Sequence, residues 1–333
     1  MSFITTKNLT RINFELTDFC NAACPMCVRH DWQGNLKKAV TNSNHTGLEL
    51  IKNKIDIKIL SRLRTIMSCG TYGDAIMNPE CLEIFEHFRR HNKNQIELYT
   101  NGGVRSKDFW AEMGKLGITV VFSIDGLEDT NHLYRRNVKW HNLYENVKTY
   151  LNNGGDAVWE FLIFKHNEHQ VKTARELSKR LGFRKFIPKH TGRWKDYSDD
   201  GEYRDTDKIL VDEYYLEKPS TQENYKLVEG ARTLRYYKDK ESNYKRIVCA
   251  SYNDKDVEIY IRANGLVSPC CFLGDVSIHE ASRLVDNLDQ INLNKASLQE
   301  ILSSNFFDRL NVGIDDENSV HRLNTCYSCC GVN

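Results

Sequence analysis

Strand-like and helix-like segments alternate along the first half of this chain, and this alternation is the strongest constraint on its fold. The predicted strands cover residues 11–16, 64–69, 95–100, 118–124, 157–164 and 184–188. Helical segments lie between them, which implies parallel pairing through right-handed crossovers. Six strands are too few to close an eight-stranded barrel. We therefore predict an α/β fold in which a partial (β/α)6 barrel of the TIM type is followed by a small α+β domain.

Capping residues mark the ends of several predicted helices. Asn78 and Pro79 suit the N-cap and the first position of one helix. Ser106 suits the N-cap of the next helix, which stops at Gly117. Gly182 ends a later one. Apart from those that begin at Asn78 and Ser106, the helices are predicted at about 47–60, 141–152, 168–181 and 297–310.

The composition changes after the predicted barrel. Residues 189–245 are charged and rich in tyrosine, without a clear period, so they form either a solvated linker or a lid over the substrate. Beyond them, the apolar runs 257–261 and 266–268 flank Asn264-Gly265, which is typical of a hairpin. The predicted domains are the barrel at 1–190, the linker or lid at 191–245, and the small domain at 246–333.

Three cysteines follow the first predicted strand. Cys20, Cys24 and Cys27 have the spacing C-x3-C-x2-C, which brings three thiolates together on one short loop. A structural zinc site usually closes with four ligands, whereas a four-iron cluster held by three thiolates leaves one iron open. The loop also lies at the carboxyl end of a strand, where α/β folds place their chemistry. A zinc site completed by His30 is the alternative.

The chain has eleven cysteines, and most of them gather near its two ends. Cys69 and Cys81 stand apart, and we interpret them as ordinary small apolar residues. The N-terminus lacks the apolar core of a signal peptide, so we expect metal binding rather than a secreted disulfide scaffold. The distal group suits a zinc ribbon as well as an iron–sulfur cluster. It consists of Cys249, Cys270, Cys271, Cys326, Cys329 and Cys330.

Charge and hydropathy argue against other classes of protein. Lys and Arg number 46 against 45 for Asp and Glu, and the net charge of +1 does not favour a nucleic-acid binder. The sequence has no run of apolar residues long enough for a membrane-spanning helix. We therefore expect a cytoplasmic protein with neither a nucleic-acid nor a membrane partner.

On these residues the chain resembles the radical S-adenosylmethionine (radical SAM) superfamily. Members of that superfamily carry C-x3-C-x2-C on the loop after the first strand of a partial barrel. The resemblance implies that Cys20, Cys24 and Cys27 hold a [4Fe–4S] cluster. The open iron of this cluster would be chelated by the amino and carboxylate groups of S-adenosylmethionine.

Further stretches occupy positions at which the superfamily contacts S-adenosylmethionine. Residues 70–74 follow the second strand and read Gly-Thr-Tyr-Gly-Asp in place of the usual Gly-Gly-Glu-Pro. Residues 100–102 end the third strand, and residues 123–126 end the fourth. Residue 26 is a methionine where an aromatic residue near adenine is common. The cofactor-binding residues implied by the resemblance are Met26, Gly70, Thr71, Tyr72, Gly73, Asp74, Thr100, Asn101, Ser123 and Asp125.

The C-terminal cysteines resemble those of the SPASM or twitch extension. The pattern Cys-x15-Gly-x4-Cys from residue 249 to residue 270 is similar to the opening of that extension. A full SPASM domain has more cysteines, so the shorter twitch form with one auxiliary [4Fe–4S] cluster fits better. The implied auxiliary ligands are Cys249, Cys270, Cys326 and Cys329, with Cys271 and Cys330 as alternates.

The resemblance implies a radical SAM oxidoreductase. Reductive cleavage of S-adenosylmethionine would give a 5′-deoxyadenosyl radical, which abstracts a hydrogen atom from the substrate. Full cysteine ligation of one auxiliary cluster favours oxidation, and we expect a small sugar-type or alcohol-type substrate. The alternatives are a peptide-modifying or protein-modifying maturase and, from another class, a non-catalytic zinc-binding scaffold. We expect a flavodoxin or ferredoxin as electron donor.

No catalytic residue can be assigned from the sequence. Polar, charged and aromatic residues near the ends of the later strands are candidates for the rim of the site, although a surface position suits them as well. They are Arg135, Arg136, Glu160, Lys165, His166, Asn167, Lys189, His190, Arg193 and Trp194.

Overall fold

The chain divides into two compact units, and both are assembled from separate stretches of sequence. The computed structural model describes residues 4–30, 35–37, 40–41, 43–191, 193–197, 203–211, 213–220, 246–252, 256–276 and 278–332. The first unit comprises Met1–Phe19, Thr41–Glu97 and Arg235–Asn333. The second unit comprises Cys20–Val40 and Leu98–Leu234.

The sheet of the first unit has the strand order β13-β12-β1-β2. Strand β1 pairs in parallel with both β2 and β12, while β12 and β13 form an antiparallel hairpin. The turn of this hairpin contains Gly265 at φ +89°, which confirms the predicted hairpin. The sequence did not predict that β12 lies beside β1. The strands are β1 (Arg11–Phe14), β2 (Thr65–Ser68), β12 (Glu258–Ile261) and β13 (Val267–Ser268).

Buried apolar side chains explain the parallel pairing in this sheet. Ile12 lies between Ile66 of β2 and Ile259 of β12 in register, and all three are fully buried. Parallel strands are covered on both faces, so near-continuous apolar runs are typical of them. Strand β12 has such a run in Glu-Ile-Tyr-Ile, and this makes it suitable for an interior position.

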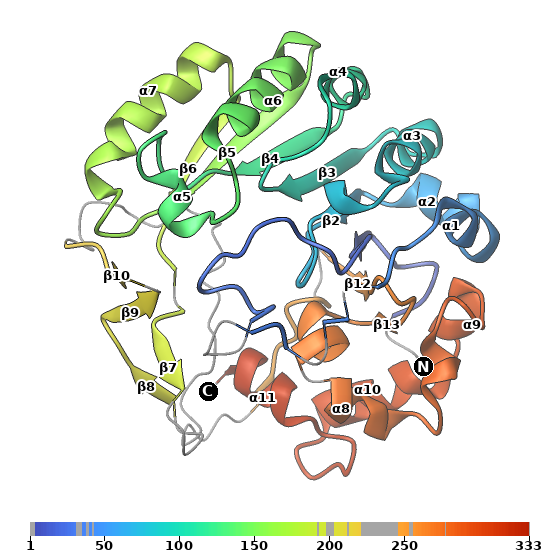
Figure 1. The fold of residues 1–333 in the computed structure, drawn as a ribbon. Helices are drawn as coiled ribbons and strands as arrows, with labels where there is room; N and C mark the ends of the chain where they lie inside the picture. Colours follow the sequence, from blue (N-terminus) through green and yellow to red (C-terminus); the bar gives the residue numbers. More distant parts are fainter. Residues whose placement is uncertain are drawn as a thin grey trace. The chain divides into compact units, whose positions relative to one another are not determined.

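Short helices make up the rest of the first unit (Figure 1). Two helices predicted as continuous are each broken: Asp56 caps a new helix by accepting the N–H of Lys58 at 2.8 Å, and Ser304 is the N-cap of another. Strands β11 (Arg246–Ile247) and β14 (Gly331–Val332) pair antiparallel. The helices are α1 (Leu48–Lys54), α2 (Ile57–Arg62), η1 (Ala75–Met77), α3 (Cys81–His91), η3 (Phe272–Val276), α8 (Ile278–Ala281), η4 (Ser282–Leu284), η5 (Leu288–Ile291), α9 (Leu298–Leu302), α10 (Asn305–Asp315) and α11 (Asn324–Cys330).

The predicted N-cap at Asn78 is wrong, because α3 begins only at Cys81. The Asn78 side chain makes other bonds: its Nδ2 donates to the carbonyls of Leu16 at 2.7 Å and Thr46 at 2.9 Å. Its Oδ1 accepts the N–H of Glu80 at 2.8 Å, which makes a local turn instead of a cap. Asn78 therefore joins three segments rather than starting a helix.

The sheet of the second unit continues from β3 through β4 and β5 to β6, with β4, β5 and β6 pairing in parallel. Strand β3 begins in the first unit and ends in the second. All six predicted barrel strands are present within one or two residues of their expected bounds. The second-unit strands are β3 (Gln95–Thr100), β4 (Thr119–Ser123), β5 (Asp156–Leu162) and β6 (Lys185–Lys189).

Helices cover the outer face of these strands (Figure 1). Trp110 of α4 and Tyr150 of α6 pack on Phe122 of β4, with ring centroids 5.4 and 5.7 Å apart. The predicted caps are confirmed: Ser106 accepts the N–H of Phe109 at 3.2 Å, and Gly182 ends α7 at φ +91°. The helices are α4 (Lys107–Lys115), α5 (Asn131–Tyr134), α6 (Trp140–Asn152), η2 (Glu168–Gln170) and α7 (Val171–Leu181).

Two hairpins follow β6, in a segment for which no strands were predicted. Strand β7 (Lys195–Tyr197) pairs with β8 (Tyr203–Asp205), and β9 (Lys208–Val211) pairs with β10 (Tyr214–Glu217). The second hairpin is anchored to α5, since the Tyr214 hydroxyl donates to the Leu133 carbonyl. Residues 192, 198–202, 212 and 221–245 of the predicted linker or lid lie outside the described residues.

The α/β fold class with parallel strands is confirmed. All eleven cysteines lie in the described ranges, and each is a free thiol. Within those ranges, no helix has both the length and the apolar character needed to cross a bilayer.

Candidate iron–sulfur and S-adenosylmethionine sites

The cysteine loop follows β1 and belongs to the second unit. The N–H of Cys27 donates to the carbonyl of Cys24 at 3.1 Å, so these two cysteines stand at the ends of one tight turn. Cys24 is buried, whereas Cys20 and Cys27 are half-buried. The loop thus offers three thiols with limited access to solvent.

Asn101 holds the first part of this loop. Its Nδ2 donates to Asn21 Oδ1 at 2.9 Å and lies 3.9 Å from Cys20 Sγ. Its Oδ1 accepts the N–H of Gly103 at 2.9 Å, which fixes the orientation of the amide. Thr100 is directed to the local backbone, where its hydroxyl accepts the N–H of Gly102 at 3.0 Å. The predicted Thr-Asn-Gly stretch therefore positions the cysteine loop through Asn101.

A buried ion pair stands beside Cys24. Arg135 Nε donates to Asp125 Oδ2 at 2.6 Å, and an Arg135 terminal nitrogen lies 3.7 Å from Cys24 Sγ. Asp125 is 0% exposed, and its second carboxylate oxygen accepts the N–H of Leu162 at 2.6 Å. The carboxylate that the sequence predicted as a cofactor contact is thus engaged with protein groups and orients Arg135 toward the thiol. A direct contact of Asp125 with S-adenosylmethionine stays a prediction.

The chemistry of Cys24 suits iron binding. Burial raises the pKa of its thiol to about 11, and the Arg135 guanidinium only partly opposes this effect. A thiolate at this position therefore needs more positive charge than Arg135 provides, and an iron ion would supply it.

Two other predicted residues lie on the loop and on a strand end of the same unit. Met26 is buried, and its carbonyl accepts a hydrogen bond from Arg193 at 3.0 Å. Arg193 thus contacts the cysteine loop, and its predicted contact with substrate stays a prediction. Ser123 ends β4 opposite Glu160 of β5, and Glu160 forms an ion pair with Lys189.

The glycine-rich turn at residues 70–74 lies in the first unit and rests on Glu15. Glu15 is 1% exposed, and its Oε1 accepts the N–H groups of Tyr72 at 2.6 Å and Gly73 at 3.2 Å. The sequence analysis missed Glu15. The available signal was a carboxylate within the apolar stretch Ile12–Leu16, which has to be paired if it is buried.

Close packing of backbone explains the glycines of this turn. A Cβ on Gly73 would lie 1.7 Å from the Thr17 carbonyl oxygen, and one on Gly70 would lie 2.3 Å from the Gly73 oxygen. Asp74 is buried, and its carboxylate accepts the N–H of Ile76 at 3.3 Å, which caps η1. The turn is thus a tightly packed backbone structure.

Thr71 and Tyr72 contact the strand that joins the sheet from the C-terminal region. The Tyr260 hydroxyl donates to Thr71 Oγ1 at 3.1 Å, and the Arg262 guanidinium lies 5.8 Å from the centre of the Tyr72 ring. Strand β12 thus supports the glycine-rich turn.

The distal cysteines gather within the first unit. Burial raises the pKa of Cys249 to about 11 and holds those of Cys270 and Cys326 well above their usual range. Neighbouring thiols raise these values further: Cys249 and Cys326 act on Cys270, and Cys249 acts on Cys326. Cys330 lies in the same group, since its carbonyl accepts the N–H of Val248 next to Cys249 at 2.9 Å. The structure therefore brings cysteines from three separate stretches together.

The arrangement of the thiols does not by itself define a metal site. Among the residues that the structure describes, no three or more His, Cys, Asp or Glu side chains are arranged to hold one metal ion. A structural zinc ion needs four donors within about 2.0–2.3 Å, whereas each cysteine of a four-iron cluster binds a different iron.

The predicted rim residues have mixed positions. Lys165 is exposed and pairs with Glu217 of β10 at 2.6 Å. His166 stacks on Phe164 with centroids 5.4 Å apart; burial lowers its pKa to about 4, and neither ring nitrogen has a hydrogen-bond partner. Asn167 is fully buried and donates to the Asp125 carbonyl at 2.8 Å. Of these three residues, His166 is the one whose polar side-chain atoms make no hydrogen bond within the described part of the chain.

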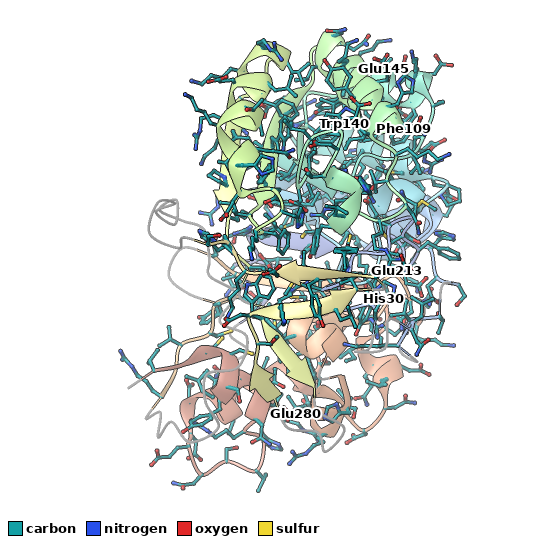
Figure 2. All side chains as sticks on the ribbon, turned by 60° about the vertical axis from the view of Figure 1, so that its left-hand side comes forward. His30, Phe109, Trp140, Glu145, Glu213 and Glu280 are labelled. Atoms are coloured by element: carbon teal, nitrogen blue, oxygen red, sulfur yellow. The ribbon has the colours of Figure 1, made fainter. Side chains whose placement is uncertain are left out.

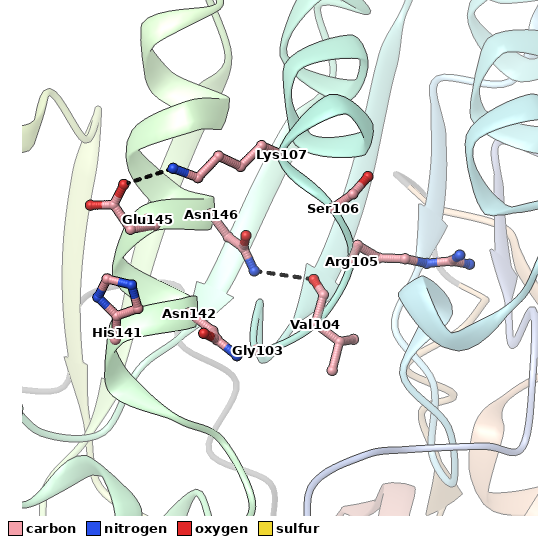
Figure 3. Close-up of a pocket in the computed structure, with 9 residues that line it drawn as sticks. All are labelled: Gly103, Val104, Arg105, Ser106, Lys107, His141, Asn142, Glu145 and Asn146. Carbon is pink, nitrogen blue, oxygen red and sulfur yellow. Dashed lines mark hydrogen bonds and ion pairs between the residues drawn. The ribbon is translucent and has the colours of Figure 1, made fainter.

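A pocket of about 490 Å³ lies at the start of α4 and α6 (Figure 3). Arg105, Lys107, His141 and Glu145 contribute to its lining, and Lys107 lies 3.4 Å from Glu145. None of the predicted cofactor or metal residues lines it. We therefore assign it no part in the reaction.

Comparison with protein families identifies the class of this protein. Residues 14–177 match the radical SAM superfamily, and residues 249–330 match the SPASM iron-sulfur cluster-binding domain. The chain therefore belongs to the radical SAM superfamily and carries a C-terminal SPASM domain. It is a radical SAM enzyme, and the predicted cofactors, [4Fe–4S] clusters and S-adenosylmethionine, are those of these two domains. The matched ranges lie inside the predicted domains 1–190 and 246–333, whose boundaries stay predictions.

Solved structures share this fold at low sequence identity. Streptococcus suis SuiB is 14% identical with a TM-score of 0.58, over 92% of this chain and 68% of SuiB. SuiB bound to precursor peptide SuiA is 14% identical with a TM-score of 0.54, over 97% of this chain and 70% of SuiB. Native anSMEcpe with bound AdoMet and Cp18Cys peptide is 13% identical with a TM-score of 0.53, over 97% of this chain and 88% of anSMEcpe. These likenesses establish the fold alone. Comparison with curated proteins finds no match.

Proposed function

We propose that this chain is a radical SAM oxidoreductase that oxidises a peptide substrate. The observation that carries the proposal is the combination of two cysteine groups, one on the loop after β1 and one in the SPASM domain. The first group would start the radical reaction, and the second would receive the electron that an oxidation releases.

Cys20, Cys24 and Cys27 would hold the cluster that binds S-adenosylmethionine. This cofactor pair supplies a 5′-deoxyadenosyl radical when bound. Asn101 and Arg135 keep the loop in place through their contacts with Cys20 and Cys24. The contacts of the turn at residues 70–74, of Ser123 and of Met26 with the cofactor stay predictions. The buried position of Cys24 limits the access of water to this loop.

Cys249, Cys270, Cys326 and Cys329 would hold one auxiliary cluster, with Cys271 and Cys330 as alternates. Four thiolates leave no iron open for substrate, which favours electron transfer over substrate binding. The substrate would lose one hydrogen atom first, and then one electron and one proton. The sum is a two-electron oxidation.

A peptide is now a better-supported substrate than the small molecule that the sequence analysis favoured. SuiB was solved bound to precursor peptide SuiA, and anSMEcpe with a bound Cp18Cys peptide. The hairpin of β9 and β10 adds a surface of suitable chemistry, because Leu210 and Tyr215 face each other across the strands and are 61% and 50% exposed.

The proposal is tested by anaerobic reconstitution of the full chain. We expect about eight iron ions per chain, the content of two four-iron clusters. We also expect 5′-deoxyadenosine release on reduction with an excess of dithionite, or with a flavodoxin or ferredoxin as the proposed natural donor. Substrate-dependent release is then compared between a peptide panel and a panel of sugars and alcohols. Deuterium transfer from a labelled peptide into 5′-deoxyadenosine supports the peptide class, and transfer only from sugars or alcohols contradicts it.

Cysteine variants test the ligand assignment separately. Replacing Cys326 and Cys329 with serine should remove about half of the iron and leave S-adenosylmethionine cleavage in place. Cys81→Ala is the matched control, since Cys81 is buried in α3 away from both groups in sequence, and its iron content should equal that of the wild type. An unchanged iron content in the double variant contradicts the auxiliary assignment.

A further inference from the structure

Glu280 connects α8 with α11, the helix that carries Cys326 and Cys329. It lies in α8 and is half-buried, and its Oε2 accepts the N–H of Thr325 at 2.9 Å. Thr325 directly precedes Cys326 in α11, so the carboxylate stands at the first turn of the helix that carries Cys326 and Cys329. Figure 2 shows Glu280 among the C-terminal segments.

The charge of Glu280 reaches both of these cysteines. Burial and the neighbouring thiols raise the pKa of Cys326 and of Cys329 most, and the charge of Glu280 raises it further. The Glu280 carboxylate thus places a negative charge at the start of the helix that carries these two cysteines.

The cysteine loop after β1 has a different charged neighbour. There, the Arg135 guanidinium, which is paired with Asp125, lies 3.7 Å from Cys24 Sγ and lowers the pKa of that thiol. A guanidinium held in an ion pair thus faces the first group of cysteines, whereas the Glu280 carboxylate lies at the start of the helix that carries part of the second. Hydrogen bonds and nearby charges are known to set the reduction potential of iron–sulfur clusters.

We infer that Glu280 tunes the auxiliary cluster, holding its reduction potential low through a carboxylate fixed at the start of the helix that carries Cys326 and Cys329. The inference rests on the proposed function, because it takes these cysteines as ligands. A negative charge next to a cluster opposes the addition of an electron. An electron received from a substrate would therefore be passed on rather than retained. Glu280 acts through the cluster and is a positioning and tuning residue.

A purely structural role is the alternative, since a carboxylate at a helix start also caps it. Glu280→Gln separates the two roles, because glutamine keeps an oxygen that accepts the Thr325 N–H and lacks the charge. Glu280→Asp keeps the charge on a shorter side chain. Glu317→Gln is the matched control, since Glu317 is exposed in the same C-terminal stretch and lies outside both α8 and α11.

The experiment is a redox titration of the reconstituted full chain, monitored by electron paramagnetic resonance. We expect Glu280→Gln to move the midpoint potential of the auxiliary cluster upward and to leave that of the cluster on the first loop unchanged. The Glu317→Gln variant should match the wild type in both, and Glu280→Asp should lie closer to the wild type than Glu280→Gln does. Iron content and the circular dichroism spectrum establish that each variant is folded and loaded.

The outcomes separate this inference from the proposed function. An auxiliary potential that stays in place in Glu280→Gln, or moves equally in both clusters, overturns the tuning role and leaves the proposed function intact. A wild-type chain that takes up iron for only one cluster overturns the proposed function, and the inference with it.

Discussion

Replacing Glu15 with glutamine tests how the glycine-rich turn at residues 70–74 is held. Glu15 accepts the N–H groups of Tyr72 and Gly73 at 2.6 and 3.2 Å while it is 1% exposed. A hydrogen bond to a charged group contributes about 1.5–3 kcal/mol, and a neutral one about 0.5–1.5 kcal/mol. Glutamine keeps the oxygen but loses the charge at both bonds. We therefore expect Glu15→Gln to lower the free energy of unfolding of the first unit by about 2 kcal/mol.

A second variant sets the largest loss in the free energy of unfolding that we expect at this position. Glu15→Ala leaves both N–H groups without this acceptor, and each unpaired buried donor costs about 1–3 kcal/mol. The expected loss is therefore about 2–6 kcal/mol, larger than that of Glu15→Gln.

Thermal unfolding of the chain under reducing conditions, followed by circular dichroism, measures these losses. A loss of about 2 kcal/mol lowers Tm by roughly 4–8 °C for a unit of 150–250 residues. Glu83→Gln is the control, because Glu83 is exposed on α3 of the same unit, and its change should stay within about 0.5 kcal/mol.

Two results would contradict this reasoning. If Glu15→Gln unfolds at the same temperature as Glu83→Gln, the charge of Glu15 does not stabilise the turn. The second result comes from the affinity of reconstituted Glu15→Gln for S-adenosylmethionine, measured by calorimetric titration. Lower stability with unchanged affinity for S-adenosylmethionine would refute the predicted cofactor contact of the turn.

Three further predictions concern the second unit. Asn101→Ala removes the amide beside Cys20, so we expect less iron to be retained after desalting of the reconstituted chain, and equal retention would refute the positioning role. Asp125→Ala leaves the Arg135 guanidinium without its carboxylate and should lower the free energy of unfolding by about 3–5 kcal/mol in a urea titration. For His166, burial lowers the pKa from 6.5 to about 4, so the unfolded chain binds the proton more tightly. Its contribution to stability is complete above pH 6.5 and is lost as the pH falls toward 4. His166→Gln should weaken this acid sensitivity by about 3 kcal/mol, and an unchanged pH profile of unfolding argues against it.

Local patterns in the sequence predicted the regular part of the fold well. The apolar runs of the barrel strands, the Ser106 cap and the Gly182 stop depend on residues only a few positions apart. The hairpin at Asn264-Gly265 is also local, and it formed as predicted. Predictions failed where a side chain found a distant partner. Asn78 is the clearest case, because it bonds to carbonyls 62 and 32 residues away instead of capping a helix.

In the candidate sites, too, local patterns could be predicted from the sequence and distant contacts could not. The spacing of Cys20, Cys24 and Cys27 pointed to their chemistry without any tertiary information, since three ligands on one loop need no distant partner. The charges around the cysteines come from elsewhere. Arg135 lies 111 residues from Cys24, and Glu280 lies 45 residues from the Thr325 N–H that it accepts. No local pattern marks such pairs.

The sequence alone determined the strand and helix alternation and the two cysteine groups, because both depend on short-range spacing, and its resemblance to the radical SAM superfamily indicated the class of chemistry. The tertiary structure decided that β12 lies beside β1, that Glu15 supports the glycine-rich turn, and that Arg135 and Glu280 lie near the two cysteine groups. These features depend on which buried groups meet after the chain folds. A buried charge or donor must find a partner, and only the packed structure specifies which one it finds.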